Sequence, residues 1–166
     1  MYLLDFLSNS EEKMKFYLTK LRIQMKLHEI IKKYNDYIPG NGSVYSQEDI
    51  KMYILVNIYP YNLSSGKIAA QVGHAIQDIT ENIKTLGDKS IKKRWSSYKK
   101  AGSAKIVLKV SETDLIEILE QTENIRKVYI VDAGRTQCPE GTVTCVGFFP
   151  LYQHEIPKIF RNLKLL

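Results

Sequence analysis

The sequence predicts an α/β protein whose mostly parallel sheet is covered by helices on both faces and preceded by a helical extension. Short β-branched apolar runs alternate with segments in which apolar residues recur every three or four positions, which is typical of strands alternating with helices. A single stretch rich in proline and glycine, Ile38–Ser43, interrupts the chain. We therefore expect a helical extension and linker over residues 1–43 and an α/β domain over residues 44–166.

Composition narrows the class of protein. The chain has 166 residues, 44% hydrophobic and 25% charged, enough for one globular domain with an extension. Its net charge of +6 favours a polyanionic partner, nucleic acid before a membrane surface, although a merely basic protein would look the same. Cys138 and Cys145 are too few for a disulfide framework and do not have zinc-ligand spacing. Without a membrane-length apolar run or a signal peptide, a cytoplasmic location is expected.

The extension reads as one amphipathic helix from Met1 to about Asn35. Its apolar positions recur at three- and four-residue steps, and lysine and arginine fill the positions between them. One interpretation is a helix packed on the domain with a solvated basic face, and the other is an added RNA-contact surface. We slightly favour packing.

The domain begins with a strand at 51–58, where alternating apolar residues indicate two partly buried faces. A helix follows from Lys67 to about Leu86, where Gly87 fits a C-cap, and a second from Ser90 to Lys100 is ended by Gly102. A second strand spans 105–110. Ser111 and Asp114 then form a capping box-like start for a third helix.

In the remainder of the chain, short apolar runs predict two further strands at 128–131 and 142–149, joined by a loop from Asp132 to Gly141. This link is short enough for a hairpin, so one antiparallel pair is compatible with the otherwise parallel sheet. A last helix is expected over Leu151–Leu163, with Pro157 disfavoured near its start.

The segment from Ser64 to Ala75 joins the first strand to the first domain helix. Ser64 or Ser65 can cap the helix, and the free N–H groups with the Lys67 ammonium would attract an anion. A phosphate-binding P-loop is excluded, because Tyr61 stands where its first glycine should be and Ile68 follows the lysine. From this segment alone, a solvated lysine in a first turn is the simpler interpretation.

Several motifs resemble the archaeal/eukaryotic-type (type 2) peptidyl-tRNA hydrolase family. They are GKIAAQxxHA at 66–75, DAGRTQ at 132–137 and GSAKIVLKV at 102–110, and the resemblance spans residues 51–166. It implies a three-layer α/β/α domain on a four-stranded mixed sheet. It also implies hydrolysis of the ester bond between peptide and tRNA, with no metal or organic cofactor, and weakly suggests a homodimer.

Asp132 and Lys67 each follow a strand, and ligand groups collect at the carboxyl ends of strands in open α/β sheets. With Thr136 they offer a carboxylate, an ammonium and a hydroxyl, a set that can activate water. From the residues alone, Asp132 could equally be a turn former and Thr136 a loop hydrogen-bonding residue. The resemblance implies that these three residues are catalytic, without deciding which of Lys67 and Asp132 acts as base and which as electrophile.

Substrate contacts are expected from residues near these three and from a basic run. Gln71 lies one turn after Lys67, and Arg135 and Gln137 flank Thr136, although each could serve as a supporting or surface residue. Lys92, Lys93 and Arg94 lie in the basic segment from Lys84 to Lys105, which we expect to hold tRNA phosphates.

His74 falls two turns after Lys67, but a lone histidine among small helical residues is more often packed and hydrogen-bonded than catalytic. We therefore expect a structural role for it. No HExxH pattern or other ligand spacing occurs, so no metal site is predicted.

Two other functions stay open. The first is an inactive relative that binds tRNA or a protein, because residues 60–65 lack the charged residues that the family usually carries there. The second is a small-molecule α/β enzyme of another class, which the missing nucleotide-binding motifs disfavour.

Overall fold

The computed structural model describes residues 2–34 and 49–166. The chain divides into two compact units, 1–36 and 37–166. The predicted linker Ile38–Ser43 and the predicted boundary between residues 43 and 44 lie outside the described residues.

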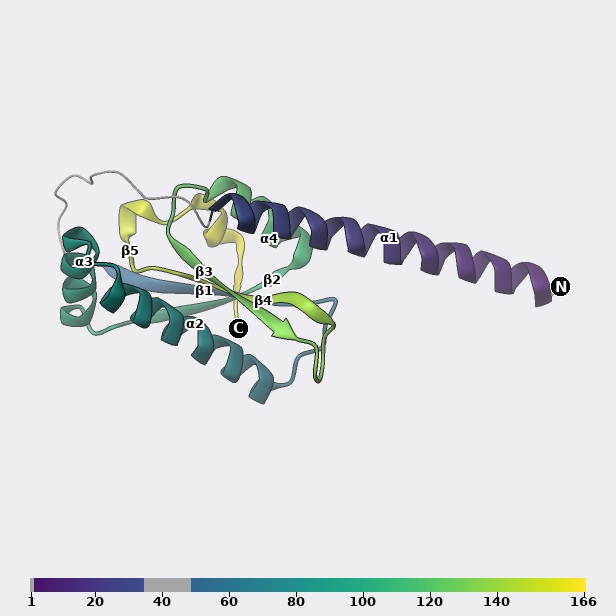
Figure 1. The fold of residues 1–166 in the computed structure, drawn as a ribbon, viewed down its shortest axis with the longest axis horizontal. Coiled ribbons are helices and arrows are strands. Elements are labelled where there is room, and N and C mark those ends of the chain that lie inside the picture. Colours follow the sequence, from purple (N-terminus) through teal and green to yellow (C-terminus); the bar gives the residue numbers. More distant parts are fainter. Residues whose placement is uncertain (1, 35–48) are drawn as a thin grey trace. The chain divides into compact units, whose positions relative to one another are not determined.

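The N-terminal unit is one helix, α1 (Tyr2–Tyr34), as the apolar periodicity predicted (Figure 1). Among the side chains of α1 that the structure describes, large apolar ones are exposed at Met14, Tyr17, Leu18, Leu21 and Met25. Among the described residues, no helix combines the length and the apolar character that crossing a bilayer requires. Whether α1 packs on the domain or contacts RNA stays a prediction.

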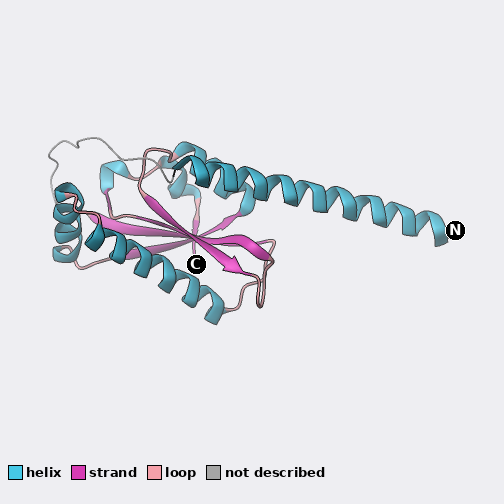
Figure 2. Cartoon of the chain, in the orientation of Figure 1, coloured by secondary structure: helices cyan, strands magenta, loops and turns pink. Residues whose placement is uncertain are grey.

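The second unit is built on a mixed sheet of six strands (Figure 2). Its order is β3-β4-β1-β2-β6, and β5 pairs with β1. The strands are β1 (Ile50–Tyr59), β2 (Lys105–Ser111), β3 (Lys127–Ala133), β4 (Glu140–Phe148), β5 (Leu151–Tyr152) and β6 (Lys164–Leu165). Of these described strands, only β1 and β2 pair in parallel, so the mostly parallel sheet expected from the alternating pattern is wrong. A helical crossover joins β1 to β2, whereas β3 and β4 form a hairpin.

The α-helices of residues 49–166 are α2 (Ser65–Thr85), α3 (Lys89–Lys100) and α4 (Glu112–Gln121). Their starts are set by side chains that accept the first free backbone N–H groups. Ser64 caps α2, Asp88 caps α3, and Ser111 with Asp114 forms the capping box predicted for α4. Gly87 and Gly102, which follow α2 and α3, have positive φ, as a glycine after a helix end commonly does.

The main core lies between β1 and the two helices that follow it. Alternate β1 residues (Met52, Ile54 and Val56) are fully buried in a cluster with Ala75 and Ile79 of α2. The intervening β1 residues face the other way, and Tyr53 contacts the ring of Phe160 from the C-terminal segment. Helix α2 also packs along β3 and β4, which fixes its N-terminal turn relative to the hairpin.

The C-terminal segment corrects two predictions. The expected helix over Leu151–Leu163 is instead β5, the short 3₁₀ helices η1 (Gln153–Glu155) and η2 (Lys158–Asn162), and β6. Pro157 has no N–H to continue a helix, and the flanking residues add pairs to β1 and β2 instead. These two short strands make the sheet six-stranded rather than four-stranded.

The hairpin is also longer than predicted. The loop expected over Asp132–Gly141 is reduced to residues 134–139, because β3 continues through Ala133 and β4 starts at Glu140. Asp132 therefore belongs to a strand, and its backbone is held by the sheet.

Candidate active site

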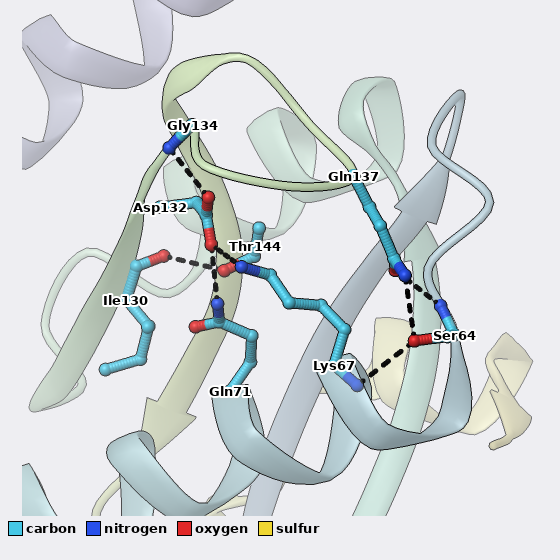
Figure 3. A network of polar contacts seen from close by, with 8 residues as sticks. All are labelled: Ser64, Lys67, Gln71, Ile130, Asp132, Gly134, Gln137 and Thr144. Carbon is cyan, nitrogen blue, oxygen red and sulfur yellow. Dashed lines mark hydrogen bonds and ion pairs between the residues drawn. The ribbon is translucent and has the colours of Figure 1, made fainter.

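Lys67 lies in the first turn of α2, and Asp132 lies near the end of β3 (Figure 3). Alternation along β3 directs Val128, Ile130 and Asp132 to the same side of the sheet, and Val128 and Ile130 join the core cluster with α2. Packing of the apolar residues thus brings the Asp132 carboxylate to α2, one turn beyond the core.

The Asp132 carboxylate accepts hydrogen bonds from three directions. Lys67 Nζ forms an ion pair with Oδ2, and Gln71 Nε2 donates to the same oxygen at 2.7 Å. The Gly134 backbone N–H donates to Oδ1 at 2.8 Å. The Asp132 side chain is only 4% exposed and that of Lys67 18%, so water competes little with this network.

These contacts lower the pKa of Asp132. The hydrogen bond from Lys67 is the largest cause, and burial opposes it; the Gly134 N–H, the Lys67 charge and the Cys138 thiol act in the same direction as the hydrogen bond. A lowered pKa keeps Asp132 ionised at neutral pH, so it can accept a hydrogen bond or a proton but does not act as an acid in this state.

Gly134 shapes the turn that follows Asp132. Its φ is +72°, and a Cβ at this position would come within 2.6 Å of the Glu140 Cα. Both the conformation and the space therefore require glycine, which explains physically why this residue lies between the site and the start of β4.

Thr136 and Arg135 are exposed in the 134–139 loop. In the described part of the chain, neither side chain is hydrogen-bonded to Lys67 or Asp132. The structure therefore brings Lys67, Asp132 and Gln71 together, whereas Thr136 lies in the exposed loop that joins β3 to β4.

Gln137 interacts with the start of α2. Its Oε1 accepts from the Ser64 backbone N–H at 2.7 Å, and its Nε2 donates to Ser64 Oγ at 2.9 Å (Figure 3). The same Ser64 oxygen caps α2 by accepting the Lys67 backbone N–H. Sequence reasoning found Ser64 as a cap but did not predict its pairing with Gln137.

Cys138 is a neighbour of Asp132 that sequence reasoning missed. Its thiol is buried in a cluster with Tyr61 and Leu63, and it helps to lower the pKa of Asp132. Burial raises the pKa of the thiol, and the Asp132 charge adds to this effect. No spacing in the sequence indicates this contact, because it depends on how the 134–139 loop folds back.

Comparison with known proteins adds independent information. Residues 50–166 match the family described as "Peptidyl-tRNA hydrolase PTH2". The chain belongs to this family. Proteins named peptidyl-tRNA hydrolase from Sulfolobus acidocaldarius and Metallosphaera sedula are each 37% identical to it, over 123 and 120 residues. One from Saccharolobus solfataricus is 35% identical over 122 residues. These alignments cover 70% of this chain and 99–100% of the relatives.

In this member of the peptidyl-tRNA hydrolase family, the basic run contains both exposed cations and a cation that is bound within the protein. Lys92 and Lys93 are exposed on α3. Arg94 instead donates through both Nη atoms to the Glu155 carboxylate, and its Nη1 also donates to the Pro150 carbonyl at 3.1 Å. Arg94 therefore ties the C-terminal segment to α3, and less of its guanidinium is available for phosphate.

His74 was expected to be packed and hydrogen-bonded, but in this family member its side chain is exposed. The buried residues of α2 are Gln71, Ala75, Ile79 and Ile83. His74 precedes Ala75 by one residue, so the helix turns its side chain about 100° away from that of Ala75. Within the described ranges, no three His, Cys, Asp or Glu side chains are grouped as metal ligands.

Chemically, the site of this PTH2 protein combines an ionised acceptor with cationic and amide donors at a helix N-terminus. Such a set can orient water and stabilise negative charge that develops on an oxygen. The Gln71 Oε1 atom is buried without a hydrogen-bond partner, so it offers one further acceptor at the site.

Proposed function

We propose that this chain hydrolyses the ester bond between a peptide and the terminal ribose of tRNA, releasing free tRNA and peptide. Membership of the PTH2 family gives the reaction class. The catalytic roles are assigned from the buried ion pair between Lys67 and Asp132. Gln71, one turn further along α2, donates to the same carboxylate oxygen.

In the proposed reaction, water is the nucleophile and Asp132 accepts its hydrogen bond. As the water oxygen adds to the ester carbonyl, its proton passes to the carboxylate, and Asp132 returns this proton to the ribose oxygen when the ester bond breaks. Lys67 and the N–H groups at the helix end stabilise the negatively charged carbonyl oxygen. Because a carboxylate with a lowered pKa is a weak base, Asp132 contributes mainly by orienting the water.

The remaining residues have proposed roles at the rim. Thr136 orients the water or a ribose hydroxyl once substrate covers the loop, and Arg135 binds a phosphate there. Gln71 binds substrate or water through its unpaired Oε1. Lys92 and Lys93, with a smaller share from Arg94, hold tRNA phosphates further from the reacting ester.

We further propose that residues 44–166 are the hydrolase domain and 1–43 an extension. The packing of α2 and α3 against one side of β1 supports a three-layer arrangement in which α4 covers the other side. A cytoplasmic location fits a substrate made during translation. A homodimer is the assembly that we propose for this domain.

The test is turnover of an N-acetylated aminoacyl-tRNA, the smallest mimic of peptidyl-tRNA, by the purified full chain. We expect release of free tRNA, and a fall of about 10²- to 10⁴-fold in kcat for both Asp132→Asn and Lys67→Met. A Gln77→Ala variant, altered on an exposed part of α2, serves as the matched control. Tight tRNA binding without turnover would instead identify a binding module.

A further inference from the structure

We infer that Gln137 is a positioning residue: its amide holds the 134–139 loop against the N-cap of α2, and it thereby fixes the position of Arg135 and Thr136 relative to the start of that helix. The inference rests on the proposed function for its kinetic consequences. It gives Gln137 a different role from the substrate contact that its place in the sequence predicted.

The contact between Gln137 and Ser64 is reciprocal. The amide oxygen accepts the Ser64 backbone N–H at 2.7 Å, and the amide nitrogen donates to the Ser64 hydroxyl at 2.9 Å. One side chain thus uses both ends of its amide on a single residue that lies 73 positions away in the sequence. A glutamine that served to bind substrate would have to break one or both of these bonds first.

A second contact fixes the other end of the same turn. The Gly134 N–H donates to Asp132 Oδ1, and Gly134 cannot relax toward β4 because the Glu140 backbone lies against it. Arg135 and Thr136 are the only two residues between the Gly134 and Gln137 attachments. Their side chains are exposed, so these two attachments, rather than packing of Arg135 or Thr136 themselves, fix where they lie.

Ser64 connects this attachment to the catalytic pair. Its Oγ accepts from Gln137 Nε2 and also from the Lys67 backbone N–H, so loop and helix end share one oxygen. Holding reacting groups in place before substrate arrives lowers the entropy lost on reaching the transition state. Loss of the attachment should therefore lower kcat more than it weakens substrate binding.

The first experiment measures the attachment in solution without any substrate. Backbone amide hydrogen exchange of Ser64 should be at least about tenfold faster in Gln137→Ala than in the wild type, because its acceptor is removed. The Gln77→Ala variant should leave exchange at Ser64 unchanged. Equal Ser64 exchange in wild type and Gln137→Ala would overturn the inference.

The second experiment measures kcat and KM on the acetylated aminoacyl-tRNA. Gln137→Ala should lower kcat by about 10- to 100-fold while KM changes less than about twofold. Ser64→Ala should give a similar loss, Ser64→Thr should retain most of the activity because it keeps the hydroxyl, and Ser64→Ala/Gln137→Ala should be no worse than the poorer single variant.

A raised KM with unchanged kcat would make Gln137 a substrate-binding residue, and fully additive losses would show that Gln137 does not act through Ser64. Both results would overturn the inference while the proposed function stands. A wild-type chain without turnover would overturn the proposed function, and the exchange measurement would still decide whether the attachment exists.

Discussion

At the scale of single residues, Asp132 is the most constrained group of the site. It is buried, yet it keeps its charge because an ammonium, a side-chain amide and a backbone N–H all donate to it. Burial alone would raise its pKa, and here the hydrogen bonds and the Lys67 charge outweigh burial. The site thereby maintains a carboxylate in a place with little access for water.

This arrangement predicts how stability depends on pH. The pKa of Asp132 is lowered by folding, so its contribution is complete above the unfolded value of about 3.9 and is lost as pH falls through the lower folded value. Chemical denaturation should show the wild type losing on the order of 2 kcal/mol more than Lys67→Met/Asp132→Asn between about pH 5 and about pH 2. Parallel losses in the two proteins would contradict a charged, paired Asp132.

At the scale of elements, the β3–β4 hairpin carries half of the site. Its register shifts beyond Ile130. Two of its glycines have positive φ: Gly134 in the turn and Gly141 near the start of β4. The two glycines differ in their surroundings, since only Gly134 has backbone within contact distance of an added Cβ. Gly141 can therefore serve as the control for Gly134 within the same hairpin.

Replacing these glycines by alanine should separate conformation from crowding. Gly141→Ala meets only the positive φ and should lower the free energy of unfolding by about 1–2 kcal/mol. Gly134→Ala also meets the Glu140 backbone, so it should lose at least about 1 kcal/mol more and should reduce turnover by shifting the Asp132 acceptor. Thermal unfolding and kcat measure both effects, and equal losses at the two positions would refute the close approach.

At the scale of the whole molecule, the charge of +6 sets the interaction with a polyanion, but not every cation contributes equally. Lys92 and Lys93 are exposed on α3, whereas Arg94 is bound to Glu155 and lies 5.1 Å from the ring centroid of Tyr152. Neighbouring residues of one helix thus divide into cations open to a ligand and a cation that holds the fold together.

This division predicts different effects of salt. Lys92→Gln/Lys93→Gln should raise KM, leave kcat nearly unchanged and reduce the slope of log affinity against log salt by about one unit for each phosphate that is no longer neutralised. Arg94→Gln should mainly lower the melting temperature, with a smaller change in slope, because it leaves Glu155 without its partner. A slope change for Arg94→Gln as large as that of a lysine variant would mean that Arg94 binds phosphate after all.

Local sequence determined much of this protein. Periodicity located α1, the helices between β1 and β3, and the four longer strands to within a few residues, since side-chain alternation and helix caps depend on near neighbours. Ser64, Ser111 with Asp114, Gly87 and Gly102 were all readable because each acts within one turn of its helix. The motifs around Lys67 and Asp132 also indicated the family that residues 50–166 match.

Tertiary structure alone decided the strand pairings and the contacts of the site. The two C-terminal strands exist because the start of β1, which lies beyond its pairs with β4, and the outer edge of β2 offer unpaired backbone groups. This is a property of the assembled sheet and not of residues 151–165. Likewise, Gln137 meets Ser64, Cys138 meets Asp132 and Arg94 meets Glu155 through the folding of the chain. Each such contact depends on where packing places two segments of the chain, so no local pattern in the sequence could specify it.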